Sequence, residues 1–354
     1  MPTTIEYPAH FRGIYEHIRA RHAPLLAAAR EHLRELPISD DLRPALAYQT
    51  WDNPQPSFIL FPLMFLAAAD ATGGVTAKHE RYLPTVLLYA ELIAVADDTV
   101  DRSVRRSGRQ TFAHRFGDAS ALPMAVTLAT LVLQRAQACD GRVFEAATAY
   151  FARFFPLELW EREHAFPEPA LYDAWLAHRY AQASWSTQFV LDSALTLNDS
   201  PTWPTAAVDA LNRIGQDVDD IVNVVEFREA DGENDDLLCG LVTRPMLQAI
   251  EARPELADQI AALWDRHRPL AAEQLSIAAY ADRRASLIRD TLPAYLPVRQ
   301  AILEHGIPAA VRACLADLRT CVRESPEALR PLMRGLAVTF LDRLRALNLV
   351  EVRA

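Results

Sequence analysis

The stretch Thr85–Asp101, TVLLYAELIAVADDTVD, indicates both the fold class and the kind of site. Its first part, Thr85–Ala96, consists mostly of apolar residues and good helix formers, without glycine or proline. A helix that is apolar on most of its faces belongs at the centre of a bundle. Three aspartates, Asp97, Asp98 and Asp101, come directly after it, so a buried helix is expected to lead into an acidic cluster.

The rest of the chain has the same helical character. Helical periodicity extends over Tyr82–Val104, Ala121–Ala136, Leu171–Leu197 and Thr205–Arg228, and in the C-terminal third to Leu349. The 354 residues include only 11 glycines, which predicts few tight hairpins, and no alternating β pattern of useful length occurs. No linker rich in glycine and serine interrupts the pattern. We therefore expect an all-α fold, a single large helical bundle that forms one domain over residues 1–354.

Charge and composition exclude several classes of function. A net charge of −10 repels a nucleic-acid backbone, so no nucleic-acid partner is expected. The four cysteines are too few and too scattered for a disulfide framework. The N-terminus lacks an apolar signal segment, and the longest apolar stretches, Phe58–Ala69 and Ala121–Leu133, are shorter than the ~18–20 residues of a membrane span. These features predict a soluble cytoplasmic protein without stable membrane insertion.

The first acidic cluster is a candidate metal site. A period of 3.6 residues places Asp97 and Asp101 on one face of the helix, with Asp98 one step round. Clustered carboxylates are electrostatically costly unless cations neutralise them. Oxygen ligands of this kind favour Mg²⁺, for which Mn²⁺ can substitute. A solvated acidic helix end is the alternative interpretation.

A second cluster repeats the same chemistry further along the chain. Asp219, Asp220 and Asn223 follow one another at i, i+1 and i+4 in the stretch GQDVDDIVN. Two such clusters on separate helices of a bundle can face each other across a central active-site cavity. Together they would hold several divalent cations and a diphosphate. The alternative is a solvated acidic face.

Arginine is the candidate anion ligand, because Lys78 is the only lysine in the sequence. The planar guanidinium group forms paired hydrogen bonds to phosphate. Arg105 and Arg106 follow the first cluster by about one helical turn, and Arg179 lies on the helix before the second. The candidate diphosphate-binding residues are Arg105, Arg106, Arg179 and Arg228.

These residues resemble the trans-polyprenyl diphosphate synthases and, more broadly, the class I terpenoid synthases. ELIAVADDTVDRSVRRSGRQTF looks like the first aspartate-rich region of that family, and GQDVDDIVNVVEFREADGENDDLLCGLVTRP looks like the second with its glycine loop. HRYAQASW, from His178, is similar to the family's lysine-threonine segment, with Arg179 at the lysine position. The resemblance spans Phe58 to Ile250 and implies an isoprenoid synthase fold, Mg²⁺ dependence with about three ions, an isoprenoid diphosphate substrate and a homodimer.

The departures from the family pattern decide the expected reaction. The family's basic GKxxRP motif corresponds to QPSFILFP, Gln55–Pro62, which has no basic residue, and the loop lysine corresponds to Leu241. An apolar wall cannot stabilise a second diphosphate. We therefore expect a terpene cyclase that ionises a single allylic diphosphate, geranylgeranyl (C20) rather than farnesyl (C15) diphosphate.

In this hypothesis each group of residues has a role. Asp97, Asp98 and Arg179 are catalytic, because the aspartates bind the Mg²⁺ that activates the leaving group and the arginine takes up its charge. The aromatic side chains Phe61, Trp185 and Phe189 are candidate cavity residues that stabilise the carbocation, or plain core residues. Two alternatives remain open. One is a chain-elongating prenyl diphosphate synthase whose second site is rebuilt from Arg81, Arg228 or Arg244. The other is a non-catalytic partner subunit of such a synthase.

Overall fold

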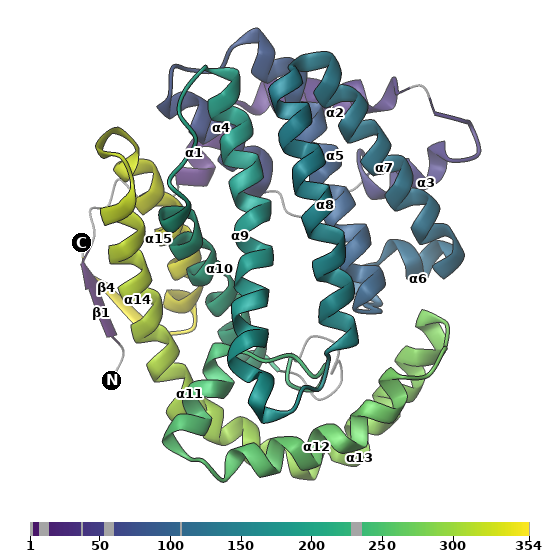
Figure 1. Cartoon of the computed structure of the whole chain (residues 1–354), viewed down its shortest axis with the longest axis vertical. Coiled ribbons are helices and arrows are strands. Elements are labelled where there is room, and N and C mark those ends of the chain that lie inside the picture. The colour runs from purple at the N-terminus through teal and green to yellow at the C-terminus, as the bar shows by residue number, and fades with distance from the viewer. Residues whose placement is uncertain are drawn as a thin grey trace. The chain divides into compact units, whose positions relative to one another are not determined.

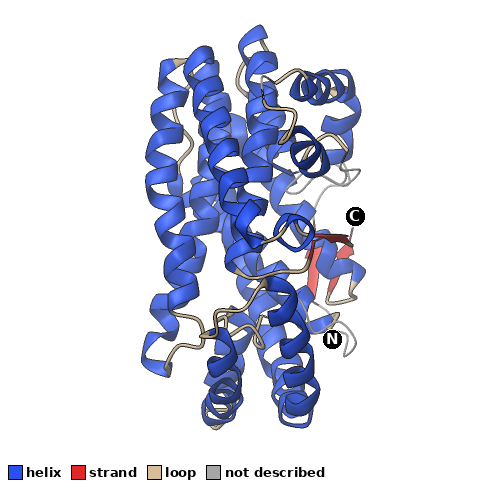
Figure 2. Ribbon diagram, turned by 90° about the vertical axis from the view of Figure 1, so that its right-hand side faces the viewer, coloured by secondary structure: helices blue, strands red, loops and turns tan. Residues whose placement is uncertain are grey.

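The computed structural model describes residues 3–6, 14–36, 38–52, 60–106, 108–227 and 236–353. Helix accounts for most of this chain, as the blue ribbons of Figure 2 show. The α-helices are α1 (Ile14–Arg21), α2 (Ala23–Arg34), α3 (Arg43–Gln49), α4 (Leu60–Ala71), α5 (Ala77–Val100), α6 (Phe112–Phe116), α7 (Asp118–Cys139), α8 (Gly141–Glu163), α9 (Tyr172–Leu197), α10 (Thr205–Val225), α11 (Arg244–Ala252), α12 (Leu256–Ala271), α13 (Ile277–Ala301), α14 (Ile307–Glu324) and α15 (Arg330–Ala346). Short 3₁₀ turns at Pro169–Leu171 and Glu327–Leu329 and a π-helical segment at Ile302–Gly306 complete the helical part. The all-α prediction is confirmed.

The strands are short and peripheral to the helices. β1 (Thr3–Glu6) pairs in parallel with β4 (Val350–Arg353), next to the two chain ends (Figure 1). β2 (Arg105–Arg106) and β3 (Arg109–Gln110) form a small antiparallel hairpin directly after α5. The arginine pair that follows the first cluster in the sequence lies in this hairpin.

The chain divides into two compact units. Unit 1 comprises Met1–Arg12, Leu159–Ser184 and Thr205–Ala354, and unit 2 comprises Gly13–Glu158 and Trp185–Pro204. The expected single domain stays a prediction. The first acidic cluster belongs to unit 2 and the second to unit 1, so each is described within its own unit.

Helix α5 is the core helix of unit 2, as its sequence predicts. It begins at Thr76, whose side chain accepts from the third residue of the helix while His79 accepts from the Thr76 backbone. From Tyr82 to Ala96 every residue is buried. The helix ends at Val100, four residues before the expected end at Val104, with Asp101 as its C-terminal cap. The cluster therefore lies where a buried helix ends, in reach of a following loop.

In unit 1, helix α10 presents one apolar face and one polar face. Val208, Leu211, Ile214, Val218 and Ile221 are buried along the first of these. The helix ends at Val225, not at the expected Arg228, and the Arg299 side chain donates to the last carbonyls, those of Val224 and Val225. Helices α12 and α13 run side by side in the same unit (Figure 1).

One described helix, α7, is long and apolar enough to span a membrane by length and composition alone. The helix continues beyond both ends of the apolar stretch Ala121–Leu133, which the sequence analysis had compared with the length of a membrane span. One third of its most apolar window is buried. Core helices of soluble proteins meet the same criteria.

Candidate active site

The first cluster consists of Asp97, Asp98 and Asp101 at the end of α5. After Asp101 the chain turns back, with Ser103 donating to the Asp98 carbonyl at 2.9 Å and Thr111 donating to the Val104 carbonyl at 3.0 Å. This return brings Arg106 of β2 onto the cluster. The Arg106 guanidinium donates to Asp98 Oδ1 at 2.8 Å and also pairs with Asp97.

Burial and the neighbouring charges shift the pKa values of Asp98 and Arg106 in opposite directions. Burial raises the pKa of Asp98 to about 7, although Arg106 works in the opposite direction. Burial disfavours the charge of Arg106, but the carboxylates of Asp97, Asp98 and Asp101 outweigh it and raise the arginine pKa. One guanidinium therefore faces three carboxyl groups, and the cluster has room for further positive charge.

Arg105, the second arginine of the pair, points elsewhere. Its side chain is exposed and donates to the Gly108 carbonyl of its own hairpin at 3.3 Å. In a two-residue strand neighbouring side chains point to opposite faces, so only one of the two can reach the aspartates. The structure thus brings Arg106 to the first cluster but not Arg105.

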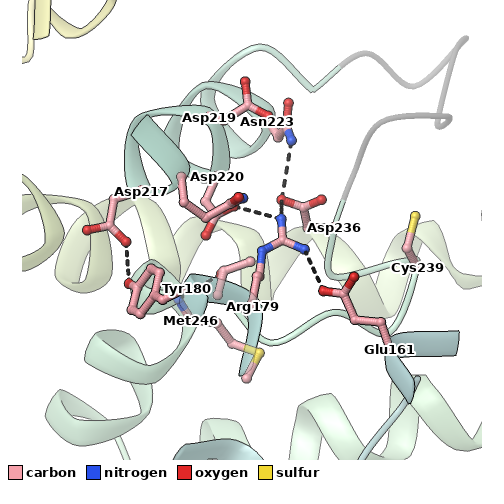
Figure 3. Close-up of polar contacts among 12 residues, drawn as sticks. Glu161, Arg179, Tyr180, Asp217, Asp219, Asp220, Asn223, Asp236, Cys239 and Met246 are labelled. Atoms are coloured by element: carbon pink, nitrogen blue, oxygen red, sulfur yellow. Dashed lines mark hydrogen bonds and ion pairs between the residues drawn. The ribbon is translucent and has the colours of Figure 1, made fainter. Parts of the chain in front are cut away.

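The second cluster is arranged around Arg179 of α9 (Figure 3). The Arg179 guanidinium lies 2.9 Å from Asp220 Oδ1, 3.4 Å from Asp236 Oδ2 and 3.8 Å from Glu161 Oε1. The Arg179 side chain is only 11% exposed. Burial opposes its charge, yet the three carboxylates raise its pKa well above the usual range. One guanidinium thus contacts three acidic side chains in this cluster.

Asp220 is the least solvated acid of this group. It is fully buried and accepts from Gln216 at 2.8 Å, while its Oδ2 atom has no hydrogen-bond partner in the described part of the chain. Burial raises its pKa, Arg179 counteracts this, and Asp236 and Asp217 add to the rise. A buried carboxylate oxygen without a partner is costly, and a bound cation would satisfy it.

Asp236 joins this cluster from outside the motif, and the sequence analysis did not include it among the site residues. It accepts from Asn223 at 3.2 Å and from Arg179. Burial raises its pKa, and the charge of Asp219 contributes. The glycine loop matched to the family pattern was the available signal, because Asp236 is the aspartate of that loop.

The turn that carries Asp236 is held by contacts with Phe166 and Trp264. Gly240 has φ of +77° and its carbonyl accepts from the Phe166 backbone at 2.8 Å. A Cβ at this position would lie 2.5 Å from the Phe166 ring, so only glycine fits. Trp264 donates to the Leu237 carbonyl at 2.7 Å. Asp236 is therefore presented by a rigid turn.

Behind the second cluster lies a chain of buried polar contacts. Tyr180 donates to Asp217, which also pairs with Arg244 at 3.0 Å. Arg244 in turn pairs with Asp317 at 3.1 Å, and Arg213 pairs with Asp317 at 2.7 Å. Arg244 is thus occupied by two carboxylates, which removes it as a ready ligand for a second diphosphate.

Asp219 and Asp220, neighbours in the motif, point to different partners. Asp219 is half exposed and pairs with Arg343 of α15 at 2.8 Å, whereas Asp220 points to Arg179. Figure 3 shows Asp219 and Asn223 on the outer turn of α10. Arg343 lies more than a hundred positions away in the sequence, so spacing alone could not assign this contact.

The candidate cavity residues separate into two groups. Phe61 and Phe189 are buried and lie 5.5 Å and 4.9 Å, respectively, from the Tyr89 ring, and Phe189 stacks on Tyr150 at 5.2 Å. Trp185 is only half buried and lies under the guanidinium of Arg153. The aromatic cluster of unit 2 therefore includes Phe61 and Phe189 with two tyrosines, but not Trp185.

The donors of both clusters fit a hard divalent cation. They are carboxylate and amide oxygens, the ligands that Mg²⁺ prefers, and Asp220 supplies an unsatisfied oxygen. In the described part of the chain, no three side chains of His, Cys, Asp or Glu converge as a preformed metal site. Arg106 and Arg179 lie against the carboxylates instead. Binding of Mg²⁺ at either cluster therefore requires the acids to shift from arginine to metal.

Several residues of the sequence analysis lie outside the described residues. These are Arg228 and the Gln55–Ile59 part of the stretch QPSFILFP. Arg81, the third arginine considered for a second site, is exposed on the first turns of α5. At a rise of about 1.5 Å per residue it lies about 24 Å along the helix from Asp97. Arg81 therefore cannot belong to the site at Asp97.

A family model described as polyprenyl synthetase matches residues 60–280, more than half of the chain. The chain belongs to the polyprenyl synthetase family. This match supports the family resemblance seen in the sequence. It does not confirm the expected terpene cyclase. No curated protein sequence matches the chain significantly.

Solved structures confirm the all-α isoprenoid synthase fold of this polyprenyl synthetase. A decaprenyl diphosphate synthase from Rhodobacter capsulatus is 19% identical, with a TM-score of 0.69 over 94% of this chain and 99% of that one. A polyprenyl synthase from Caulobacter crescentus CB15, complexed with calcium and isoprenyl diphosphate, is 18% identical, with a TM-score of 0.65 over 92% and 97%. A geranylgeranyl pyrophosphate synthase from Lactobacillus brevis is 15% identical, with a TM-score of 0.65 over 91% and 97%.

Proposed function

We propose that this polyprenyl synthetase is a Mg²⁺-dependent prenyl diphosphate synthase, which condenses an allylic isoprenoid diphosphate with isopentenyl diphosphate. The observation that carries the proposal is Arg179, buried among Asp220, Asp236 and Glu161 at the position of a family lysine. Family membership supports it, because members of the polyprenyl synthetase family depend on Mg²⁺ and act on isoprenoid diphosphates. The sequence analysis preferred cyclisation and kept chain elongation as the alternative. The proposal reverses this preference.

The first step is ionisation of the allylic carbon–oxygen bond. When bound, Mg²⁺ neutralises the departing diphosphate as a Lewis acid. In unit 2 the residues that would hold Mg²⁺ are Asp97, Asp98 and Asp101, and in unit 1 they are Asp220, Asp236 and Asn223, with Asp219 available beside these. Within its own unit, Arg179 or Arg106 would donate hydrogen bonds to the diphosphate, to which negative charge shifts as the bond breaks.

The second step forms a bond between the allylic carbon and the double bond of isopentenyl diphosphate. The resulting cation loses a proton, which the released diphosphate can accept, and the product is a longer prenyl diphosphate. Tyr89, Tyr150, Phe61 and Phe189 form an electron-rich aromatic cluster in unit 2 that can stabilise positive charge. We infer a C20 rather than a C15 allylic substrate, because Ala94 and Ala96 on α5 are small.

Cyclisation without isopentenyl diphosphate is the second candidate, and a specific observation favours it. The loop lysine of the family is replaced by the half-buried Leu241, and of the arginines considered as replacements, Arg244 is paired with two aspartates and Arg81 is remote. A second diphosphate needs cationic ligands. In a cyclase the same ionisation would occur, and the carbocation would react with a double bond of the same prenyl substrate.

Product analysis distinguishes the two reactions. Purified protein is incubated with Mg²⁺ and geranyl, farnesyl or geranylgeranyl diphosphate, each with and without isopentenyl diphosphate. The hexane extract and the phosphatase-treated aqueous phase are both analysed. A longer prenyl alcohol that requires isopentenyl diphosphate supports the synthase. A cyclic hydrocarbon or alcohol formed without it supports the cyclase. The expected homodimer and cytoplasmic location stay predictions.

A further inference from the structure

Unit 2 contains a groove that the proposed reaction does not use. It lies between α2, α5 and α7 and has a volume of about 460 Å³, within the usual range for small-molecule sites. Its lining residues are Leu25, Ala28, Ala29, His32, Glu80, Arg81, Pro84, Arg135, Ala138 and Cys139. All of them belong to unit 2 and to the described part of the chain.

Two arginines of this groove lack a carboxylate partner. In the described residues neither Arg81 nor Arg135 forms an ion pair, in contrast to Arg106, Arg179 and Arg244. Arg135 contacts His32 Nε2 at 3.1 Å and donates to the Arg81 carbonyl at 3.5 Å. Its buried Nε atom has no hydrogen-bond partner in the same residues. A bound anion would supply both the hydrogen-bond acceptor and the counter-charge that such a guanidinium lacks.

The charge balance of the lining supports the same conclusion. Glu80 is the one acid among the lining residues, against Arg81 and Arg135. Burial lowers the pKa of Arg135, as expected for a guanidinium without a counter-charge. The groove thus has an excess of one positive charge when His32 is neutral.

The remaining wall of the groove is apolar. Leu25, Ala28, Ala29, Pro84 and Ala138 contribute only aliphatic groups. A ligand that satisfies both parts has an anionic head and a short hydrocarbon body. Inorganic phosphate would leave the aliphatic wall exposed to water, and a neutral hydrocarbon would leave the two arginines uncompensated.

The groove is distinct from the candidate active site. Arg81 and Pro84 lie on the first turns of α5, whereas Asp97, Asp98 and Asp101 lie at its other end. The separation along this one helix is about 24 Å. A head group held by Arg81 therefore cannot also contact the aspartates.

We propose that the groove between α2, α5 and α7 is a binding site for an amphipathic anion, a phosphate or carboxylate head on a short hydrocarbon chain, with Arg81 and Arg135 as ligands of the head. The inference does not depend on the reaction catalysed by the protein. Its occupant is separate from the allylic substrate.

Cys139 gives a direct readout, because its thiol lines the groove and is half buried. Alkylation of Cys139 by iodoacetamide is measured by mass spectrometry in the full-length protein, with decyl phosphate, decanoate, decanol or inorganic phosphate added. Cys239 is also half buried but belongs to unit 1, so it serves as an internal control. We expect decyl phosphate or decanoate to slow the alkylation of Cys139 at least tenfold and to leave Cys239 unchanged. The comparison of these two ligands identifies the preferred head.

Matched variants test the role of the arginines. Calorimetric binding of the better ligand is expected to weaken at least tenfold in Arg81→Gln/Arg135→Gln and in Ala28→Trp, which fills the groove at an exposed position. Arg153→Gln, an exposed arginine of the same unit, is expected to bind like the wild type. Melting temperatures exclude unfolding as the cause. The proposal is overturned if neither ligand protects Cys139, if decanol protects it equally, or if the arginine variants keep wild-type affinity.

Discussion

At the scale of single residues, arginine lies at the centre of both acidic clusters. Arg179 contacts three acids with one planar group, which a lysine ammonium could not span in the same way. Arg106 similarly bridges Asp97 and Asp98. Each guanidinium group thus partly offsets the negative charge of the acids in its own cluster.

Replacing Arg179 tests this role. Arg179→Gln leaves Asp220, Asp236 and Glu161 without the guanidinium, and breaking a buried pair typically costs about 3–5 kcal/mol. We expect the free energy of unfolding in urea to fall by that order, and kcat to fall about 10²–10³-fold. Arg179→Lys is the control that keeps the charge, and it should recover most of the stability but only part of kcat. Wild-type stability in the glutamine variant would contradict the assignment.

Sequence patterns reached some of these residues and missed others. The aspartates of both motifs follow from local spacing within one helix, and Arg179 follows from the family resemblance, although its partners lie on other elements. Asp236 and Arg343 do not, since they reach the cluster through a turn and through α15. Arg105 was proposed together with Arg106 because both follow the first cluster closely in the sequence, but in strand β2 their side chains point to opposite faces.

At the scale of elements, the turn after α10 determines where Asp236 lies. Its backbone is fixed by the positive φ of Gly240 and by the contact of that glycine with Phe166. The fold class was predictable from helical periodicity, whereas this tertiary contact was not, because it joins two loops far apart in the sequence.

Substitution of this glycine gives a prediction at the same scale. Gly240→Ala introduces a Cβ that overlaps Phe166 and also strains the backbone, and we expect a loss of stability of about 2–4 kcal/mol with a reduced Mg²⁺ affinity. Gly117→Ala is the matched control. Gly117 has φ of +86° and no atom within 4 Å of an added Cβ, so only the backbone strain remains. Equal losses in both variants, measured by urea unfolding, would argue against the Phe166 contact.

The α12–α13 pair predicts a dependence of stability on pH. His267 of α12 is buried and contacts Thr291 Oγ1 of α13 at 3.0 Å. Burial, together with Arg284 and Arg266, lowers the His267 pKa from 6.5 to about 4. Between pH 6.5 and about 4, His267 therefore binds a proton in the unfolded chain but not in the folded chain. The stability that neutral His267 contributes is present above pH 6.5 and is lost as pH falls toward 4, by up to about 3 kcal/mol.

His267→Gln isolates this contribution. Glutamine can keep a hydrogen bond to Thr291 but does not titrate. We expect the difference in free energy of unfolding between wild type and variant to shift in favour of the variant as pH falls from 7 to 4. A difference that is constant with pH would show that His267 does not titrate in this way.

At the scale of the whole molecule, the family match and the helical fold agree with the resemblance in the sequence. The homodimer implied by that resemblance has a candidate surface on α7. Leu122 and Val126 are 71% and 56% exposed, one helical turn apart. Two exposed aliphatic residues on one helix face favour contact with another chain.

Mass measurement in solution tests the dimer. Light scattering is expected to give twice the chain mass of 39.6 kDa for the wild type. In Leu122→Glu/Val126→Glu the charged side chains would be desolvated at the interface, so we expect the monomer mass with the helical content unchanged. A substitution pair at exposed positions of another helix of unit 2, Thr148→Glu/Ala152→Glu in α8, compares the effect of charge alone. A monomeric wild type, or a dimer that persists in the first variant, contradicts the prediction.

The most direct measurement of the central claim is the Mg²⁺-dependent release of inorganic diphosphate from geranylgeranyl diphosphate, because both candidate reactions begin with this bond cleavage. With isopentenyl diphosphate present, we predict diphosphate release that stops when EDTA is added and falls at least 10²-fold in Asp97→Asn and in Asp220→Asn. Asp52→Asn, an exposed aspartate of unit 2, should release diphosphate at the wild-type rate. Release that persists in EDTA or in both motif variants, or no release from any allylic diphosphate with or without isopentenyl diphosphate, would contradict the account.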